Sequence, residues 1–240
     1  MAHITRIYVP GHLSPGHLRI DGEQARRLTS VMRLRPGEPF LLFNGDGREW
    51  EATVEEAGKG FVVAKVGRIL RQAPAPALTI ELWVSIVRPN RFDWAIEKCI
   101  EAGADVIRPI IAEHSARGEG ASSGRQERWD RIAVEAAEQC GRLHLGVVEP
   151  PARFDDLLRK NHGALLFAER EGACWVETER LLPEAGTVAV AIGPEGGFSA
   201  EEASRARAQG ALPVNLGPNT LRTETAAVVA TALLRGARTG

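Results

Sequence analysis

The sequence has little of what marks secreted, membrane-spanning or metal-binding proteins. Its three cysteines are widely spaced and form no Cys-x-x-Cys pair, which favours free thiols over a disulfide or a zinc site. They are Cys99, Cys140 and Cys174. No apolar run approaches the roughly 18 residues of a membrane-spanning helix, and the N-terminus, MAHITRIYV, lacks the apolar core of a signal peptide. These absences predict a cytoplasmic protein with no membrane segment and no bound metal.

A strong imbalance of charge is also missing, because 30 Lys and Arg residues stand against 31 Asp and Glu residues. The chain as a whole is therefore no polycation. Its two parts differ, however, since residues 1–72 hold 11 basic and 8 acidic residues, whereas the remainder holds 19 and 23. This mild asymmetry indicates that the N-terminal part faces an anionic partner.

Residues 1–72 have the pattern of a small β-barrel, with many short strands and one helix. The best signal is a hairpin, in which the apolar runs 40–43 and 49–54 flank Asn-Gly-Asp-Gly. The other predicted strands are 5–9, 17–20 and 61–66. The one helix is expected to begin at a cap on Asp21 and to end at about Arg33.

The pattern changes after residues 72–77, where alternating prolines predict a linker. Short apolar runs typical of buried strands then alternate with amphipathic helices. The predicted strands are 80–87, 106–111, 147–148 and 164–168; the predicted helices include one ending at Gly103, one ending at Gly141 and one around 155–159. Such alternation predicts an α/β fold with a mostly parallel sheet covered on both faces. Residues 113–124, rich in Gly and Ser, are expected to be a loop.

The last fifty residues carry two glycine loops, each after a short strand. The predicted strand 188–192 runs into Gly-Pro-Glu-Gly-Gly, and Ser199 with Glu202 then predicts a capped helix. A second strand at 214–216 is broken by Gly-Pro, and a final helix over 225–234 would bury one apolar face. That face contains Ala226, Val229, Ala230 and Leu233. Loops at the carboxyl ends of strands are where open α/β sheets bind ligands.

The runs IGPEGGFS and LGPNTLRTETAA resemble the SPOUT (α/β-knot) methyltransferases, and most closely the bacterial 16S rRNA uracil-N3 methyltransferases. RRLTSVMRLRPGEPFLLFNGDG is similar to that family's PUA-like RNA-binding barrel, and RPNRFDWAIEKCIEAGADVIRPI and RWDRIAVEAAEQCGR are similar to its middle motifs. The resemblance implies a PUA-like β-barrel over 1–72 and a SPOUT α/β-knot domain with a trefoil knot over 73–240. It also implies a homodimer that methylates N3 of a uridine in the decoding region of 16S rRNA, within the small ribosomal subunit.

By the same resemblance, three walls hold S-adenosylmethionine, and no metal is needed. The cofactor-binding candidates are Leu166, Phe167, Ala168, Glu169, Ile192, Gly193, Pro194, Glu195, Gly196, Gly197, Leu216, Gly217, Leu221, Thr223, Thr225 and Ala226. An isolated glycine loop is more often only a turn, but two pre-shaped loops side by side make a pocket. Neither loop has the Lys and Ser/Thr of a phosphate-binding loop, so a nucleoside fits better than a triphosphate.

Arginines supply the remaining candidates. Arg222 is the candidate catalytic cation, since it can hold the target uridine or stabilise its anion; alternatively it is a surface partner of Glu224. Candidate RNA contacts are Arg26, Arg27, Arg33, Arg88, Arg91 and Arg142, several of which could equally form a solvated face. His114 is a weaker candidate base. Asn219-Thr220 replaces the family's usual Arg-Ile, so any role of that Arg is missing here.

Two other functions remain open at this point. A non-catalytic RNA-binding or ribosome-assembly factor would need only a degenerate pocket, which the complete GPEGG and LRTETA runs disfavour. A nucleotide hydrolase would need a phosphate-binding lysine and metal carboxylates, and no motif supplies them.

Overall fold

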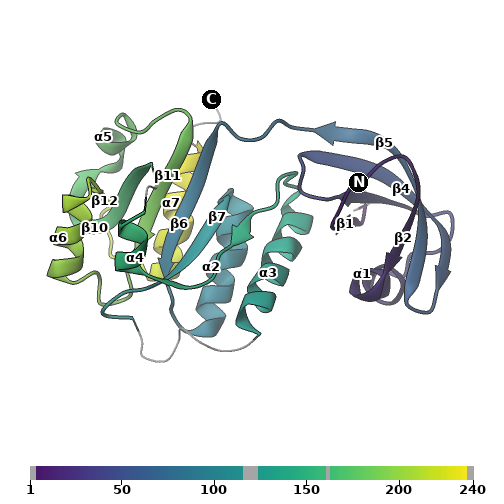
Figure 1. Cartoon of the computed structure of the whole chain (residues 1–240), viewed down its shortest axis with the longest axis horizontal. Coiled ribbons are helices and arrows are strands. Elements are labelled where there is room, and N and C mark those ends of the chain that lie inside the picture. The colour runs from purple at the N-terminus through teal and green to yellow at the C-terminus, as the bar shows by residue number, and fades with distance from the viewer. Residues whose placement is uncertain (1–3, 116–123, 161–162, 237–240) are drawn as a thin grey trace. The chain divides into compact units, whose positions relative to one another are not determined.

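The computed structural model describes residues 4–115, 124–160 and 163–236 (Figure 1). The chain divides into two compact units. The first comprises Met1–Ala75 together with Ala137–Leu145, and the second comprises Pro76–Ala136 and Gly146–Gly240. The first unit is therefore built from two separate stretches of the sequence.

A five-stranded sheet forms the first unit, in the order β1-β3-β4-β5-β2. Its strands are β1 (Arg6–Tyr8), β2 (Gly16–Asp21), β3 (Pro39–Phe43), β4 (Arg48–Gly58) and β5 (Phe61–Gln72). The predicted hairpin is confirmed, because β3 and β4 pair antiparallel around the Asn-Gly turn. Of the strand pairs described in this unit, β1 with β3 is parallel and the others are antiparallel. Three register shifts between β4 and β5 bend the sheet, as bulges do, around a core that includes Leu28, Phe40 and Leu42.

The predicted first helix is shorter and less regular than expected. It is α-helical only over α1 (Gly22–Arg26) and continues as a π-helix, η1 (Arg27–Val31), where Met32 N–H donates to Arg27 O at 2.9 Å. The predicted Asp21 cap is wrong, since its side chain accepts no helix N–H. The carboxylate of Asp21 pairs instead with Arg19, 3.0 Å away, and its backbone belongs to β2. A left-handed backbone at Arg33, with φ 58°, lies just beyond the helix.

A buried arginine joins the two stretches of the first unit. Arg6 donates to Glu49 at 2.6 Å, to the carbonyl of Ala137 at 2.5 Å and to that of Arg142 at 2.6 Å. Glu138 accepts from Arg27 at 2.6 Å. Burial lowers the pKa of the Arg6 guanidinium, and the hydrogen bond to Glu49 opposes that effect. A buried charge is tolerated only with such partners, so Arg6 fixes the segment 137–142 beside β1.

The second unit contains a sheet in which all the described pairings are parallel, in the order β12-β10-β11-β6-β7-β8, with β9 also beside β7 (Figure 1). Its strands are β6 (Leu78–Ser85), β7 (Val106–Ile111), β8 (Val147–Val148), β9 (Ala152–Arg153), β10 (Ala164–Cys174), β11 (Gly186–Ile192) and β12 (Leu212–Asn215). Its helices are α2 (Pro89–Ala102), α3 (Arg125–Cys140, which ends in the first unit), α4 (Phe154–Leu158), α5 (Trp175–Glu179), α6 (Ala200–Ala208) and α7 (Thr223–Gly236). The predicted alternation of strands and helices is confirmed; of the predicted loop over 113–124, residues 116–123 lie outside the described residues.

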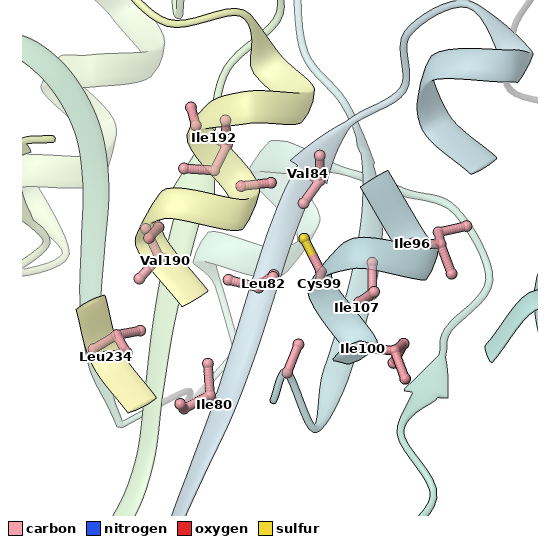
Figure 2. Close-up of a cluster of buried hydrophobic side chains, with 14 of the residues drawn as sticks. Ile80, Leu82, Val84, Ile96, Cys99, Ile100, Ile107, Val190, Ile192 and Leu234 are labelled. Carbon is pink, nitrogen blue, oxygen red and sulfur yellow. The ribbon is translucent and has the colours of Figure 1, made fainter. Parts of the chain in front are cut away.

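Two hydrophobic layers cover the two faces of this sheet, as the alternation of side chains along a strand requires. On β6, Leu82 and its neighbours two residues away point into a core shared with α2, α3 and α7. Figure 2 shows the part of this core between the sheet, α2 and α7. Trp83 points to the other face, where it meets α4 and α6. On β11, Val190 and Ala191 divide in the same way between the two layers. Both faces of the sheet are therefore buried, which explains the unbroken apolar runs in the sequence.

The predicted buried face of the last helix is half right. Ala226 and Ala230 are buried as predicted, whereas Val229 and Leu233 are only half-buried and Ala227 and Leu234 are buried instead. Two threonines also belong to the buried face, so a search for apolar residues does not recognise all of it. Their hydroxyls donate to backbone carbonyls and can therefore be buried without penalty. Thr223 Oγ1 donates to Gly193 O at 3.0 Å, and Thr231 Oγ1 donates to Ala227 O at 2.7 Å.

None of the helices in the part of the chain that the structure describes is both long and apolar enough to cross a membrane.

Candidate functional site

A hollow of about 210 Å³ opens where β10, β11 and β12 end, at the edge predicted for a ligand site. This volume is smaller than the roughly 300–1,000 Å³ of typical small-ligand pockets, and the hollow is open to solvent on one side. Its lining consists of Ala168, Glu169, Arg170, Ile192, Gly193, Pro194, Glu195, Gly197, Val214, Asn215, Leu216, Gly217, Asn219, Thr220, Leu221, Thr223 and Ala226. Apolar side chains and loop backbone therefore dominate the walls.

The loop after β11 is a tight turn that needs its glycines. Gly197 N–H donates to Pro194 O at 2.8 Å, and Gly197 has φ 71°, a conformation that other residues rarely adopt. The helix α6 follows immediately. Its predicted capping box is confirmed, since Ser199 accepts from Glu202 N–H while the Glu202 carboxylate accepts from Ser199 N–H. The loop is thus fixed at both of its ends.

The loop after β12 is tied to β10 and is closed by the start of α7. Asn215 donates to the carbonyl of Arg170 at 2.5 Å and accepts from Gly217 N–H at 2.8 Å. The hydroxyl of Thr223 joins α7 to Gly193 in the neighbouring loop. The two glycine loops that the sequence predicts to be neighbours therefore meet at one hollow.

Twelve of the sixteen predicted cofactor residues line the hollow, and four do not. Leu166 and Phe167 are buried on opposite faces of the sheet, in its two cores. Gly196 lies against His114, and Thr225 is half-buried on α7 outside the lining. The lining residues that the sequence analysis missed are Arg170, Val214, Asn215, Asn219 and Thr220.

An irregularity in β10 explains why Arg170 was missed. The register with β12 shifts between Ala168 and Ala173, which marks a bulge that re-aims the residues within it. The sequence signal for this bulge is Gly172 alone. A Cβ at this position would lie 2.6 Å from the backbone nitrogen of Val214 and collide with it. By contrast, Asn219 and Thr220 stood inside the predicted loop and could have been included.

Charged side chains surround the hollow in two groups. Glu169, in the lining, pairs with Arg207, whose guanidinium also lies over the ring of Phe167. On the other side, Arg91 of α2 lies 3.6 Å from Glu195 and 3.8 Å from Glu224. Arg222, the predicted catalytic cation, is exposed between the lining residues Leu221 and Thr223.

The six arginines predicted to bind RNA fall into two classes. Arg26, Arg33 and Arg88 are exposed. The other three already have partners within the protein: Arg27 pairs with Glu138, Arg91 lies between two glutamates, and Arg142 donates to His144 O at 2.6 Å. Arg26 and Arg27 line a shallow hollow of the first unit. Among the described residues, the exposed class can contact phosphates without breaking an internal ion pair.

Within the described ranges, no group of three or more His, Cys, Asp or Glu side chains could hold a metal ion. Arg170 is the one cation among the residues that line the hollow. Backbone groups, apolar walls and few charges suit a nucleoside-like ligand. Together with the parallel sheet, these features define an α/β protein that binds a small ligand at its strand ends and carries a separate small β unit.

Comparison with known proteins identifies the family to which the chain belongs. Residues 73–235 match the RNA methyltransferase domain family, and residues 20–67 match the RNA methyltransferase PUA domain. Ribosomal RNA small subunit methyltransferase E of Mycobacterium tuberculosis is 33% identical over 224 residues, which cover 88% of this chain and 83% of that protein. The chain therefore belongs to the ribosomal RNA small subunit methyltransferase E family, and the predicted PUA-like domain followed by an α/β domain is confirmed.

Solved structures agree with this assignment. A Legionella pneumophila protein solved with its bound cofactor SAM superimposes with a TM-score of 0.88 at 33% identity, covering 98% of both chains. Ribosomal RNA small subunit methyltransferase E from Neisseria gonorrhoeae, bound to S-adenosyl methionine, gives a TM-score of 0.83 at 28% identity and the same coverage.

Proposed function

We propose that this protein transfers the methyl group of S-adenosylmethionine to N3 of a uridine in 16S rRNA. The observation that carries the proposal is the hollow at the ends of β10, β11 and β12, lined by both glycine loops. The family supports it as well, since relatives are named as ribosomal RNA small subunit methyltransferases and two neighbours hold this cofactor. We infer a cytoplasmic location as well, because the proposed substrate is bacterial ribosomal RNA.

The residues of the hollow fit this cofactor. Ile192, Leu216 and Leu221 offer apolar contact for an adenine ring. The backbone of the Gly193–Gly197 loop can approach a ribose or an amino acid group closely, because glycines carry no side chain in the way. When bound, S-adenosylmethionine supplies an electrophilic methyl group on a cationic sulfur. The protein's task is then to hold donor and acceptor in line, which is a large part of catalysis in such displacements.

The uracil that accepts the methyl group must have its developing negative charge stabilised. N3 of uracil carries a proton that must leave, so negative charge develops on the imide. The guanidinium of Arg222, exposed beside Leu221 and Thr223, is the candidate to stabilise that charge. No intramolecular ion pair or hydrogen bond engages this side chain among the residues that the structure describes, so it is available to the RNA.

The direct test is methylation of 16S rRNA and of small ribosomal subunits by purified protein, followed by mass spectrometry of the nucleosides. We expect 3-methyluridine at a single site, formed only when S-adenosylmethionine is present. The same uridine should lack its methyl group in cells without the gene. Tight binding of RNA and cofactor without any methyl transfer would instead favour a non-catalytic ribosome-assembly factor.

Two finer features belong to the same proposal. The first unit would bind the RNA backbone through its exposed arginines. The second unit would carry the trefoil knot and pair with a second copy through it, as the resemblance to the SPOUT methyltransferases implies. The half-buried Val229 and Leu233 on α7 support a protein contact there, because they remain partly open to solvent in a single chain.

A further inference from the structure

Arg91 lies where three elements of the second unit converge. It sits in the first turn of α2, with its backbone N–H bonded to Arg88 O at 2.9 Å. Its Nη1 is 3.6 Å from Oε1 of Glu195, in the loop after β11, and its Nε is 3.8 Å from Oε1 of Glu224, in the first turn of α7. One guanidinium therefore bridges a pocket loop and the helix that closes the pocket.

The burial of Glu224 explains why a cation is held there. Glu224 is 7% exposed, and its Oε2 has no hydrogen-bond partner in the described part of the chain. A buried carboxylate is costly unless a positive charge or hydrogen-bond donors compensate it. The N-terminal end of α7 contributes part of that compensation, and Arg91 contributes the rest. The position of Arg91 is thus set by a buried charge, whereas a side chain that serves RNA alone would face only solvent.

A second link between the same two elements lies inside the hollow. Thr223, the neighbour of Glu224, donates to Gly193 O at 3.0 Å, and Glu195 is two residues further along that loop. Both Thr223 and Glu195 belong to the lining. The loop after β11 and the start of α7 are therefore joined twice, directly through Thr223 and indirectly through Arg91.

We propose that Arg91 is a positioning residue of the cofactor pocket, which holds the Gly193–Gly197 loop against α7 through Glu195 and Glu224. The identity of the ligand rests on the proposed function, but the positioning role rests on these contacts. Loss of the bridge lets the loop and the helix separate, so the pocket must be ordered again whenever the ligand binds.

The test compares binding of S-adenosylmethionine with that of its demethylated product, by calorimetry on the full-length protein. The two ligands differ only in the methyl group and in the positive charge that it leaves on the sulfur. For Arg91→Ala we expect the Kd of both to rise by the same factor, roughly five- to thirtyfold, the scale of two partly exposed ion pairs lost together. An effect on only one ligand would mean that Arg91 acts by charge on the sulfonium, which overturns the proposal.

Lys98→Ala is the matched control. It also removes one positive charge from α2, but Lys98 pairs within its own helix, with Glu97 and Glu101 at 2.8 Å each. Its affinity for both ligands should remain within about twofold of the wild type, as expected for distant sites. Glu224→Gln is a second variant, which keeps the size of the side chain. It should weaken the binding of both ligands as Arg91→Ala does.

Kinetics separate this role from an RNA contact. Arg91→Ala should raise the KM for S-adenosylmethionine while leaving kcat at saturating cofactor, and the salt dependence of RNA binding, close to the wild type. A changed salt slope with unchanged cofactor affinity would show that Arg91 serves the RNA instead. If the wild type bound neither ligand, the proposed function would fail; if it bound both and Arg91→Ala did so equally well, only the positioning role would fail.

Discussion

Arg222 and Arg91 are both basic residues beside the hollow, yet their surroundings give them different tasks. Arg91 is held by two carboxylates, whereas Arg222 is exposed next to two lining residues. An arginine that must meet a substrate is most useful when no internal partner competes for it. The exposed Arg222 therefore remains the better candidate for contact with the uracil.

Replacing Arg222 by Ala should slow the chemical step and leave cofactor binding intact. We expect single-turnover methylation at saturating RNA and cofactor to fall by roughly 10²–10³-fold, the effect of removing one charge-stabilising donor. The affinity for S-adenosylmethionine should stay within about twofold. Rapid-quench measurements with labelled cofactor test this, and an unchanged single-turnover rate would exclude Arg222 from the chemistry.

The three cysteines should differ sharply in reactivity, because only the thiolate reacts with alkylating reagents. Cys140 and Cys174 are exposed, but Cys99, on α2, is buried in the core that Figure 2 shows. Burial raises the pKa of the Cys99 thiol to about 12, against a smaller opposing effect of a hydrogen bond with Thr231. At pH 8 we therefore expect two labelled cysteines in the folded protein and three after unfolding, counted by mass spectrometry.

The same burial affects stability at high pH. An unfolded thiol ionises near 9.0, whereas the folded thiol of Cys99 ionises near 12. The folded state therefore keeps its proton where the unfolded state loses it, and the free energy of unfolding falls as the pH rises from 9.0 towards 12. Below 9.0 this contribution is fully present. Cys99→Ala should remove the pH dependence that comes from this group, at the expense of a small cavity.

At the scale of elements, the sequence predicts strongly periodic segments and glycine turns well. The alternation of strands and helices, the hairpin around Asn-Gly and the capping box at Ser199 depend on neighbouring residues, and all three are confirmed. The failures involve polar interactions that the sequence pattern does not show. Asp21 caps no helix because Arg19 and β2 already engage it, and the buried face of α7 includes threonines that bond to backbone.

The site shows the same division. Pocket residues carried by the two glycine loops could be predicted, whereas Arg170 depends on a bulge whose register is set by another strand. The sequence shows where cations stand but not which of them are paired. Arg27 looked like an RNA contact, yet its partner, Glu138, is 111 residues away in the chain.

Gly103 ends α2 and contacts the end of α7. Replacing it therefore tests how one residue fixes two helices. Gly103 has φ 108°, and its carbonyl accepts two hydrogen bonds from Arg235 at the end of α7. A Cβ at this position would lie 2.9 Å from Nε of Arg235. Gly103→Ala should therefore destabilise the protein by about 1–3 kcal/mol, from backbone strain and the displaced arginine. Urea denaturation measures this, with Gly210→Ala as a control that has left-handed strain but open space.

At the scale of the whole molecule, RNA binding should depend on the exposed arginines of the first unit. Arg26→Gln with Arg33→Gln removes two exposed charges from the first unit. We expect weaker RNA binding and a slope of log K against log salt that is shallower by about 1.5, since each phosphate contact contributes roughly 0.7–0.9. Fluorescence anisotropy at several salt concentrations measures the slope. Arg27 is left unchanged, because its loss would leave the buried Glu138 unpaired.

Assembly is the second prediction at this scale. We expect a homodimer that buries Val229 and Leu233 of α7, which are half-buried in the single chain. Sedimentation velocity at micromolar concentration should show the dimer, and Leu233→Asp should shift it towards monomer because a charge would enter an apolar contact. A fully active wild-type monomer would contradict this prediction.

Arg6 donates to the carbonyls of Ala137 and Arg142, so its hydrogen bonds cannot all form early in translation. A ribosome makes the N-terminal stretch first, but the acceptors that complete its buried arginine emerge only when more than half of the chain has been translated. Until then, of its three hydrogen bonds described above, Arg6 can form the one to Glu49. The first unit therefore stays incomplete until its second stretch, Ala137–Leu145, has been made. A gene fragment that stops at the linker would encode the sheet without the piece that finishes it.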